Sequence, residues 1–237
     1  LMQGDFGTSI FSSKPVTELI KQRLEPTILL ASCTIIFSVI IAVPLGTIAA
    51  IKAGSWIDRT VMLFSVGGFS IPVFVLGYIL IYVFSINLRI LPVQGYKSPF
   101  EFGIIPFLQH IILPTITLSV IYIALLARMT RASVIEVLEE DYIRTARAKG
   151  LSETKILMRH ALRNAAVPIV TVIGLGIALL IGGVVVTESV YNIPGLGRLV
   201  LDAVLARDYP IIQGLILFFS LVYVLLNLLI DLAYTFF

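Results

Sequence analysis

The 237-residue sequence is poor in charged residues, and the gaps between them are long. Asp, Glu, Lys and Arg make up 13% of the chain, against roughly 25% in ordinary globular domains, while 58% of the residues are hydrophobic. Five stretches of 26, 29, 26, 24 and 22 residues contain no charge. Each is long enough for a membrane-spanning helix, which needs about 20 mostly apolar residues. The five stretches lie between Glu25 and Lys52, Arg59 and Arg89, Glu101 and Arg128, Arg163 and Glu188, and Asp208 and Asp231.

These uncharged stretches predict helices, because the backbone must satisfy its own hydrogen bonds in lipid. They lack the alternation of a β-barrel, and five of them leave too little polar surface for a water-soluble helical core. The expected fold class is therefore an all-α polytopic membrane protein. Residues 27–237 are expected to form one transmembrane domain after an extracytoplasmic segment 1–26, in which PVTELIKQRL predicts a short amphipathic helix. Proline and glycine predict kinks in four spans, and the alternative is that these residues are simply commoner in membrane helices. The kinks are expected at Pro44 and Gly46, at Gly67, Gly68 and Pro72, at Pro114 and at Pro168.

Other missing features exclude several functions. The single cysteine, Cys33, cannot form an internal disulfide. The spans contain no ionisable residue apart from His110 and Asp231 at their edges, so the sequence shows no site for a coupling ion. No G-x-x-x-x-G-K-[ST] loop is present to cradle a phosphate. The chain is therefore not expected to be an enzyme, and energy for uphill transport must come from a partner.

Charge is concentrated in one place. The segment Arg128–Arg163 carries eight of the seventeen Lys and Arg residues and five of the fourteen acids. Since positive residues favour cytoplasmic loops, this segment is expected inside, together with the link Lys52–Arg59. Residues 1–26, Asn87–His110 and the loop 188–210 then face outward.

The charged segment 128–163 predicts two short helices separated by a break. A stripe that runs from Ile135 through Tyr142 to Ala146 predicts one face of the first helix. Gly150 fits the left-handed position that ends a helix, and Ser152 is a candidate N-cap for the second. The interspersed acids favour docking against a cytoplasmic partner, and the alternative is a basic amphipathic helix on anionic lipid.

The outer loop predicts a turn at Pro194–Gly195, followed by a helix with one apolar face over Leu196–Val204. Asp202, Arg207 and Asp208 would offer polar contacts beside it. This helix would either form a stiff element at the mouth of a pathway or anchor the loop to lipid.

The stretch DYIRTARAKGLSETKILMRHALRNAAVP resembles the cytoplasmic loop of permease subunits of binding-protein-dependent ABC importers. More narrowly, it resembles the B-type permeases of dipeptide, oligopeptide and nickel systems, as do GGVVVTESVYNIPGLGRLV, RDYPIIQG and GDFGTS. The chain departs from the general E-A-A-x-x-x-G-x₉-I-x-L-P pattern, since Arg144 and Thr145 replace its first two letters and His160 and Arg163 replace its Ile and Pro, while Leu162 matches. Ala146 and Gly150 match it.

The resemblance implies a type I ABC importer permease fold in a bacterial or archaeal plasma (inner) membrane, with five spans visible here of an expected six. It implies a C-type permease as heterodimer partner, two cytoplasmic ATP-binding subunits that use ATP and Mg, and an extracytoplasmic solute-binding protein. Membrane lipid is also an expected partner, whereas nucleic acid is not, and this chain is expected to bind no cofactor or metal itself.

The expected ATPase-coupling residues are Glu140, Asp141, Tyr142, Arg144, Thr145, Ala146, Ala148 and Gly150. The expected outer-gate or binding-protein contacts are Pro194, Gly195, Gly197, Asp202 and Asp208. The solute would be a short peptide or a similar small molecule, since relatives of this branch carry peptides, glutathione, nickel or metal chelates. The alternatives are a membrane scaffold or regulatory protein whose inner loop binds lipid or a cytosolic partner, and a channel.

Overall fold

The computed structural model describes residues 6–234, with residues 178, 179, 181, 233 and 234 in backbone only. In this part of the chain all regular elements are helical, apart from one isolated bridge between Thr8 and Pro15. The predicted all-α fold class is therefore confirmed. The first two residues of the GDFGTS stretch, Gly4 and Asp5, and both chain ends fall outside the described residues.

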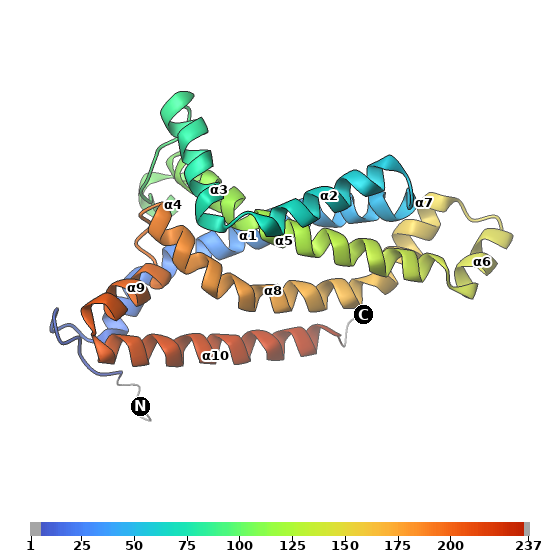
Figure 1. The fold of residues 1–237 in the computed structure, drawn as a ribbon. Helices are drawn as coiled ribbons and strands as arrows, with labels where there is room; N and C mark the ends of the chain where they lie inside the picture. The colour runs from blue at the N-terminus through green and yellow to red at the C-terminus, as the bar shows by residue number, and fades with distance from the viewer. Residues whose placement is uncertain (1–5, 235–237) are drawn as a thin grey trace. The chain divides into compact units, whose positions relative to one another are not determined.

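The helices are numbered in chain order, and Figure 1 labels the α-helices. They are α1 (Val16–Ile51), α2 (Trp56–Ser70), α3 (Val73–Leu80), the π-helical stretch η1 (Ile81–Asn87), α4 (Pro99–Phe102), α5 (Ile104–Leu138), α6 (Asp141–Ala148), α7 (Glu153–Lys155), the π-helical stretch η2 (Ile156–Ala161), α8 (Leu162–Val190), α9 (Leu196–Ala206) and α10 (Tyr209–Tyr234).

Among the described residues, four helices are long and apolar enough to cross a membrane, and α2 with α3–η1 makes a fifth candidate if that pair is one broken span. The break lies at Ile71–Pro72, where Pro72 has an extended ψ of 136°. Proline lacks an N–H and disfavours helical dihedrals in the residue before it. The sequence predicted a kink here, and the structure interrupts the helix. Pro114 and Pro168, in contrast, lie inside α5 and α8 without ending them.

The N-terminal region differs from the prediction of a separate short helix. α1 begins at Val16 and continues through the first uncharged stretch to Ile51. No glycine occurs between Val16 and Leu45, so no residue offers an unstrained left-handed stop. The expected outer segment and the first span therefore share one continuous helix.

The chain divides into two compact units, to both of which α1, α5, α8 and α10 contribute. Unit 1 comprises residues 1–34, 71–119 and 177–225, and unit 2 comprises residues 35–70, 120–176 and 226–237.

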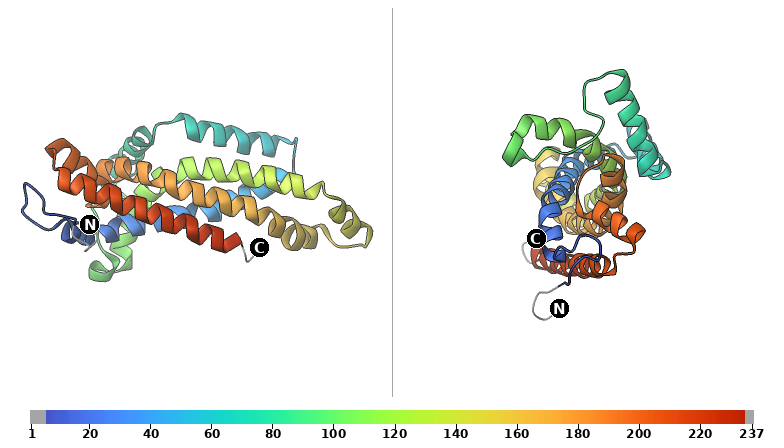
Figure 2. Two further views of the ribbon diagram at one scale, coloured as in Figure 1. Left: turned by 90° about the horizontal axis from the view of Figure 1, so that it is seen from below. Right: turned by 90° about the vertical axis from the view of Figure 1, so that its left-hand side faces the viewer.

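In unit 1, α9 packs with the beginnings of α1 and α10 (Figures 1 and 2). Leu196, Leu199 and Ala203 recur at helical spacing on α9 and are buried. The predicted helix with one apolar face is thus confirmed, and it continues two residues beyond Val204. The buried members of this cluster are Val16, Ile20, Leu196, Leu199, Ala203, Ile211 and Leu215.

In unit 2, small residues let the second half of α1 approach α5 closely. A Cβ added at Gly46 would lie 2.7 Å from the Cβ of Thr130 and 3.1 Å from the backbone nitrogen of Arg131. Small residues commonly allow such close packing of membrane helices. The packing fixes the end of α5, from which the charged segment continues. The buried core of this unit consists of Ala42, Ala50, Leu126, Ala127, Val134, Ala165, Ile169 and Val172.

Candidate functional site

The first candidate site is the charged segment after α5. α5 stops at Leu138, the chain turns, and α6 starts at Asp141. The predicted stripe from Ile135 through Tyr142 to Ala146 is therefore wrong, because its members lie on two separate helices. Helical spacing counted across a turn does not place residues on one face.

α6 is anchored by one buried side chain. Ile143 has no exposed surface, whereas Tyr142 is 43% exposed. Ala146 follows Ile143 by about one turn and is half-buried, while Ala148 is exposed. The surface of α6 that a partner can reach therefore includes Ala148 and Tyr142 more than Ala146.

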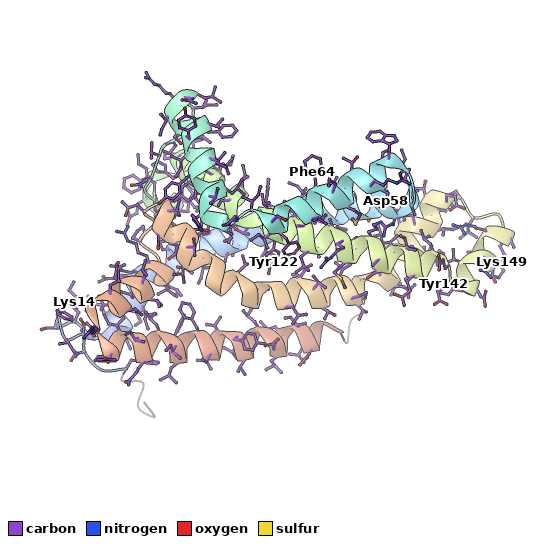
Figure 3. The ribbon with its side chains drawn as sticks, in the orientation of Figure 1. Lys14, Asp58, Phe64, Tyr122, Tyr142 and Lys149 are labelled. Atoms are coloured by element: carbon purple, nitrogen blue, oxygen red, sulfur yellow. The ribbon has the colours of Figure 1, made fainter. Side chains whose placement is uncertain are left out.

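Apart from Ala146, the predicted coupling residues on and beside α6 lie on the exposed surface, as Figure 3 shows for the labelled Tyr142. Asp141 pairs with Arg144 at 3.2 Å, but both side chains are largely exposed, so this pair adds little stability. Partial burial raises the pKa of the Tyr142 phenol, and the carboxylate of Glu140 raises that pKa further. The phenol therefore stays protonated and can donate a hydrogen bond. The exposed residues of this set are Glu140, Asp141, Tyr142, Arg144, Thr145 and Ala148.

Gly150 ends the first helix of the segment as predicted. Its φ is +77°, in the left-handed region, and a Cβ there would meet no atom within 4 Å. The requirement for glycine is therefore one of backbone conformation. The N–H of Gly150 donates to the carbonyl of Arg147 at 2.9 Å, and Leu151 donates to Ala146 at 3.2 Å. Ser152 occupies the predicted N-cap position, although its side chain makes no capping bond.

A salt bridge across this turn was not predicted. The guanidinium of Arg147 donates to both carboxylate oxygens of Glu153, at 2.8 and 3.2 Å. This bond raises the pKa of Arg147 and holds the two sides of the turn together. We call residues 141–153 the coupling hairpin, after the role that the sequence predicts for this segment. Arg147, Glu153 and Leu138 also line a cavity of about 330 Å³ beside it.

A second unpredicted pair joins α2 to α5 within unit 2. The guanidinium of Arg131 donates through Nε and Nη2 to the two carboxylate oxygens of Asp58, with Nη2–Oδ2 at 2.7 Å. Asp58 is 4% exposed and also accepts from the N–H of Gly54 at 2.9 Å. The pair therefore fixes the link between α1 and α2 against α5, just ahead of the coupling hairpin.

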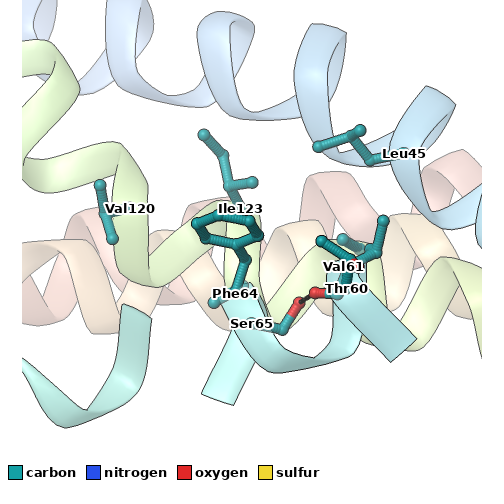
Figure 4. A pocket seen from close by; sticks show the side chains of 9 residues that line it. Leu45, Thr60, Val61, Phe64, Ser65, Val120 and Ile123 are labelled. Atoms are coloured by element: carbon teal, nitrogen blue, oxygen red, sulfur yellow. Dashed lines mark hydrogen bonds between the residues drawn. The ribbon is translucent and has the colours of Figure 1, made fainter. Parts of the chain in front are cut away.

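A cavity of about 420 Å³ lies between α1, α2 and α5 (Figure 4). Apolar side chains from all three helices line it, among them Leu45, Phe64 and Ile123. The hydroxyls of Thr60 and Ser65 each donate to a carbonyl four residues earlier in α2, at 2.8 and 2.9 Å. A binding site for a polar solute needs several polar groups that point at the solute. The lining of this cavity is too apolar to provide them.

The second candidate site is the outer loop around α9, where both predicted glycines are buried. A Cβ at Gly195 would overlap the carboxylate of Glu188, and one at Gly197 would lie 2.7 Å from the Cα of Val185. The φ of Gly195 is −101°, so glycine is needed there for close approach rather than for a left-handed turn. The Pro194–Gly195 turn thus lets α9 begin directly against α8.

The two predicted aspartates of this loop differ in exposure. The side chain of Asp202 is 52% exposed and lies 3.8 Å from Arg23 and 3.9 Å from Arg198. Asp208 is 2% exposed and accepts a hydrogen bond from the Ser9 hydroxyl at 2.6 Å. A partner can reach Asp202, whereas Asp208 ties the loop to the N-terminal segment.

Glu188 was not among the predicted site residues, yet it is fully buried at the start of the outer loop. Its carboxylate faces the first turn of α9. In the sequence Glu188 only marks the end of an uncharged stretch, where a solvent-exposed loop residue is the usual expectation.

Neither candidate site has the groups for metal chemistry. Within residues 6–234, no group of three or more His, Cys, Asp or Glu side chains could hold a metal ion. What the two sites offer instead is an exposed charged hairpin and a helix docked on a buried carboxylate.

A protein-family model described as "binding-protein-dependent transport system inner membrane component" matches residues 42–237. The chain belongs to this family. It is therefore a permease subunit of an importer, and an inner membrane component with several membrane-spanning helices. The predicted resemblance to permease subunits of binding-protein-dependent importers is therefore confirmed.

Two curated relatives of this permease are similar over nearly its whole length. It is 57% identical over 235 residues to the probable peptide ABC transporter permease protein y4tP of Sinorhizobium fredii, covering 99% of this chain and 75% of the relative. It is 48% identical over 233 residues to the glutathione transport system permease protein GsiC of Escherichia coli, covering 98% of this chain and 73% of the relative.

Solved structures confirm the fold. The permease matches a chain of the inward-facing MetNI methionine ABC transporter with a TM-score of 0.70 at 18% identity, over 91% of this chain and 94% of that one. It matches a chain of an amino acid ABC transporter with a TM-score of 0.67 at 15% identity, over 93% and 95% of the two chains. At these identities the likeness concerns the fold alone, which is that of a type I importer permease.

Proposed function

We propose that this permease forms half of a translocation pathway for short peptides or similar small solutes, with ATP hydrolysis by partner subunits as the energy source. The observation that carries the proposal is the coupling hairpin, residues 141–153. It is a short helix anchored by Ile143 and closed by the Arg147–Glu153 bridge, and its remaining charged surface is free for a partner. The names of the relatives, a peptide permease and a glutathione permease, support a peptide-like solute.

The proposed assembly contains three kinds of partner. A C-type permease would complete the pathway as a heterodimer, and each permease would receive one cytoplasmic ATP-binding subunit on its coupling hairpin. A solute-binding protein would deliver the solute at the outer loop, where Asp202 and the exposed side of α9 are accessible. The coupling hairpin then faces the cytoplasm and the loop 188–210 faces outward, as the distribution of Lys and Arg indicates.

The proposal is tested by uptake and co-purification in the native host. Cells that lack this chain should lose uptake of a labelled dipeptide or of labelled glutathione, and the wild-type gene should restore it. An affinity-tagged permease should bring an ATP-binding subunit with it from solubilised membranes. If neither uptake is affected and no ATP-binding subunit is recovered, the scaffold alternative replaces the proposed function.

A further inference from the structure

Glu188 holds a buried carboxylate against the first turn of α9. One oxygen, Oε1, accepts from the hydroxyl of Thr27 on α1 at 2.6 Å. The other, Oε2, accepts from the backbone N–H of Arg198 at 2.9 Å, and the N–H of Gly197 also donates to this carboxylate. Glu188 has no exposed surface, so water does not compete for these bonds.

Thr27 completes the arrangement. Its Oγ1 donates to Glu188 and accepts the backbone N–H of Leu196 at 2.8 Å. The first N–H groups of a helix have no partner within the helix, and the N-cap of α9, Gly195, has no side chain to supply one. The three consecutive donors of Leu196, Gly197 and Arg198 are instead satisfied by side chains from α1 and α8. α9 is therefore joined at its beginning to two long helices.

The close fit makes this junction specific. Gly195 and Gly197 leave no room for a Cβ against Glu188 and Val185. Arg23, which lies one turn before Thr27 on α1, also approaches Asp202 at 3.8 Å, but this part-exposed pair adds little to the junction. Loss of the carboxylate would leave the buried backbone donors of α9 without partners, and unpaired buried donors destabilise the folded state.

We propose that Glu188 is a positioning residue: together with Thr27 it fixes the first turn of α9 to α1 and α8, so that a solute-binding protein docking on α9 acts directly on these helices. This inference rests on the proposed function, because it assumes that a binding protein docks at the outer loop. The junction itself, however, is a structural statement that can be tested without transport.

The structural test is limited trypsin cleavage after Arg198, which lies in the first turn of α9. The complex is purified in lipid nanodiscs, and cleavage at Arg198 is followed by mass spectrometry. Glu188→Ala should raise the cleavage rate by about tenfold or more, since the backbone N–H groups of Gly197 and Arg198 and the Thr27 hydroxyl all lose their acceptor. In Thr27→Val, valine keeps nearly the shape of threonine but lacks the hydroxyl, so this variant should also be cleaved faster than the wild type. Thr27→Ser should restore the wild-type rate.

Three further variants sharpen this test. Glu188→Asp keeps the charge but is one methylene too short, so it should behave like Glu188→Ala. Glu188→Gln keeps the length of the side chain and one acceptor oxygen for the N–H groups of Gly197 and Arg198. Its cleavage rate should therefore be close to the wild-type rate. Glu101→Ala removes an exposed glutamate of the same unit and serves as the matched control, with no change expected.

The functional test measures the concentration of solute-binding protein that half-maximally stimulates ATP hydrolysis by the reconstituted complex. Glu188→Ala and Thr27→Val should raise this concentration about tenfold, whereas Thr27→Ser and Glu101→Ala should leave it unchanged. If Glu188→Ala yields no folded protein, Thr27→Val supplies both measurements.

The possible failures can be told apart. Cleavage of the Thr27→Val and Glu188→Asp variants at the wild-type rate would overturn the junction. Faster cleavage with an unchanged half-maximal concentration would overturn the positioning role. If the wild-type complex shows no stimulation by any binding protein, the proposed function fails, and the cleavage rates still decide whether the junction exists.

Discussion

Asp58 and Asp141 carry the same charge and each pairs with an arginine, but their surroundings differ. The Asp58 side chain is 6% exposed and receives two bonds from Arg131, whereas the Asp141 side chain is 95% exposed beside Arg144. An exposed pair is worth little, whereas removing one partner of a buried pair leaves a charge without compensation. Burial therefore decides which of these aspartates matters for stability.

Asp58→Ala should destabilise the permease towards the lower end of about 3–5 kcal/mol, because the Arg131 side chain it leaves behind is 27% exposed. Asp141→Ala, the matched control, should change stability by less than about 1 kcal/mol. Both are measured by unfolding in lipid nanodiscs with increasing denaturant. Equal midpoints for the two variants would show that the buried pair does not hold α2 to α5.

Gly150 offers a second comparison at the scale of one residue. Its φ of +77° disfavours any residue with a Cβ, whereas Gly67 in α2 has no positive φ. A Cβ added at either glycine would meet no atom within 4 Å, so the two positions differ in backbone conformation and not in space. Gly150→Val should cost about 1–2 kcal/mol in the hairpin and reduce co-purification of the ATP-binding subunit. Gly67→Val should leave co-purification unchanged. Full recovery of that subunit with Gly150→Val would contradict the role given to the turn.

At the scale of elements, the sequence predicted the turn of the hairpin at Gly150 but not which residues of α6 are buried and which are exposed. Gly150 and the candidate N-cap Ser152 indicated a break between two helices, and the structure has this break but adds another one after Leu138. The predicted stripe from Ile135 to Ala146 was wrong because the chain turns after Leu138, so the helical spacing does not continue from α5 into α6. Ile143 is the side chain that anchors α6, and local spacing did not single it out.

The exposed and half-buried alanines of α6 should respond differently to a bulky replacement. Ala148→Trp should block the ATP-binding subunit while the permease alone keeps its unfolding midpoint, since overpacking at an interface costs about 1–3 kcal/mol by analogy with cores. Ala146→Trp should lower the midpoint of the permease itself, because Ala146 is half-buried in its own chain. Thermal unfolding and co-purification are measured for both. A lowered midpoint for Ala148→Trp with intact docking would reverse the assignment of faces.

Contacts between distant parts of the chain explain what sequence reasoning missed. Asp58 and Arg131 are 73 residues apart, and Thr27 and Glu188 are 161 residues apart. Neither separation leaves a periodic signal, so each acid looked like an ordinary residue at the edge of an uncharged stretch. The glycines of the outer loop were found, but the reason for them, close approach to Glu188 and Val185, needed the structure.

At the scale of the whole molecule, the spans follow from charge spacing, and their sidedness remains a prediction. Single cysteines at position 152 and position 101, in a Cys33→Ser background, should react with an impermeant thiol reagent from opposite sides of the membrane. Ser152 should label from the cytoplasm and Glu101 from outside, since both residues are exposed. Ser98 is unsuitable because it is 8% exposed and its hydroxyl caps α4. Labelling from the same side would overturn the topology.

The most direct test of the central claim is solute accumulation in proteoliposomes that contain this permease, its C-type partner and two ATP-binding subunits. With the solute-binding protein outside and ATP inside, a labelled short peptide should accumulate above its outside concentration. Accumulation should stop when either ATP or the binding protein is omitted. Movement of the peptide that needs neither and only equalises the two sides would indicate a channel. An assembled, ATP-hydrolysing complex that accumulates neither dipeptides, oligopeptides nor glutathione would contradict the proposed solute class.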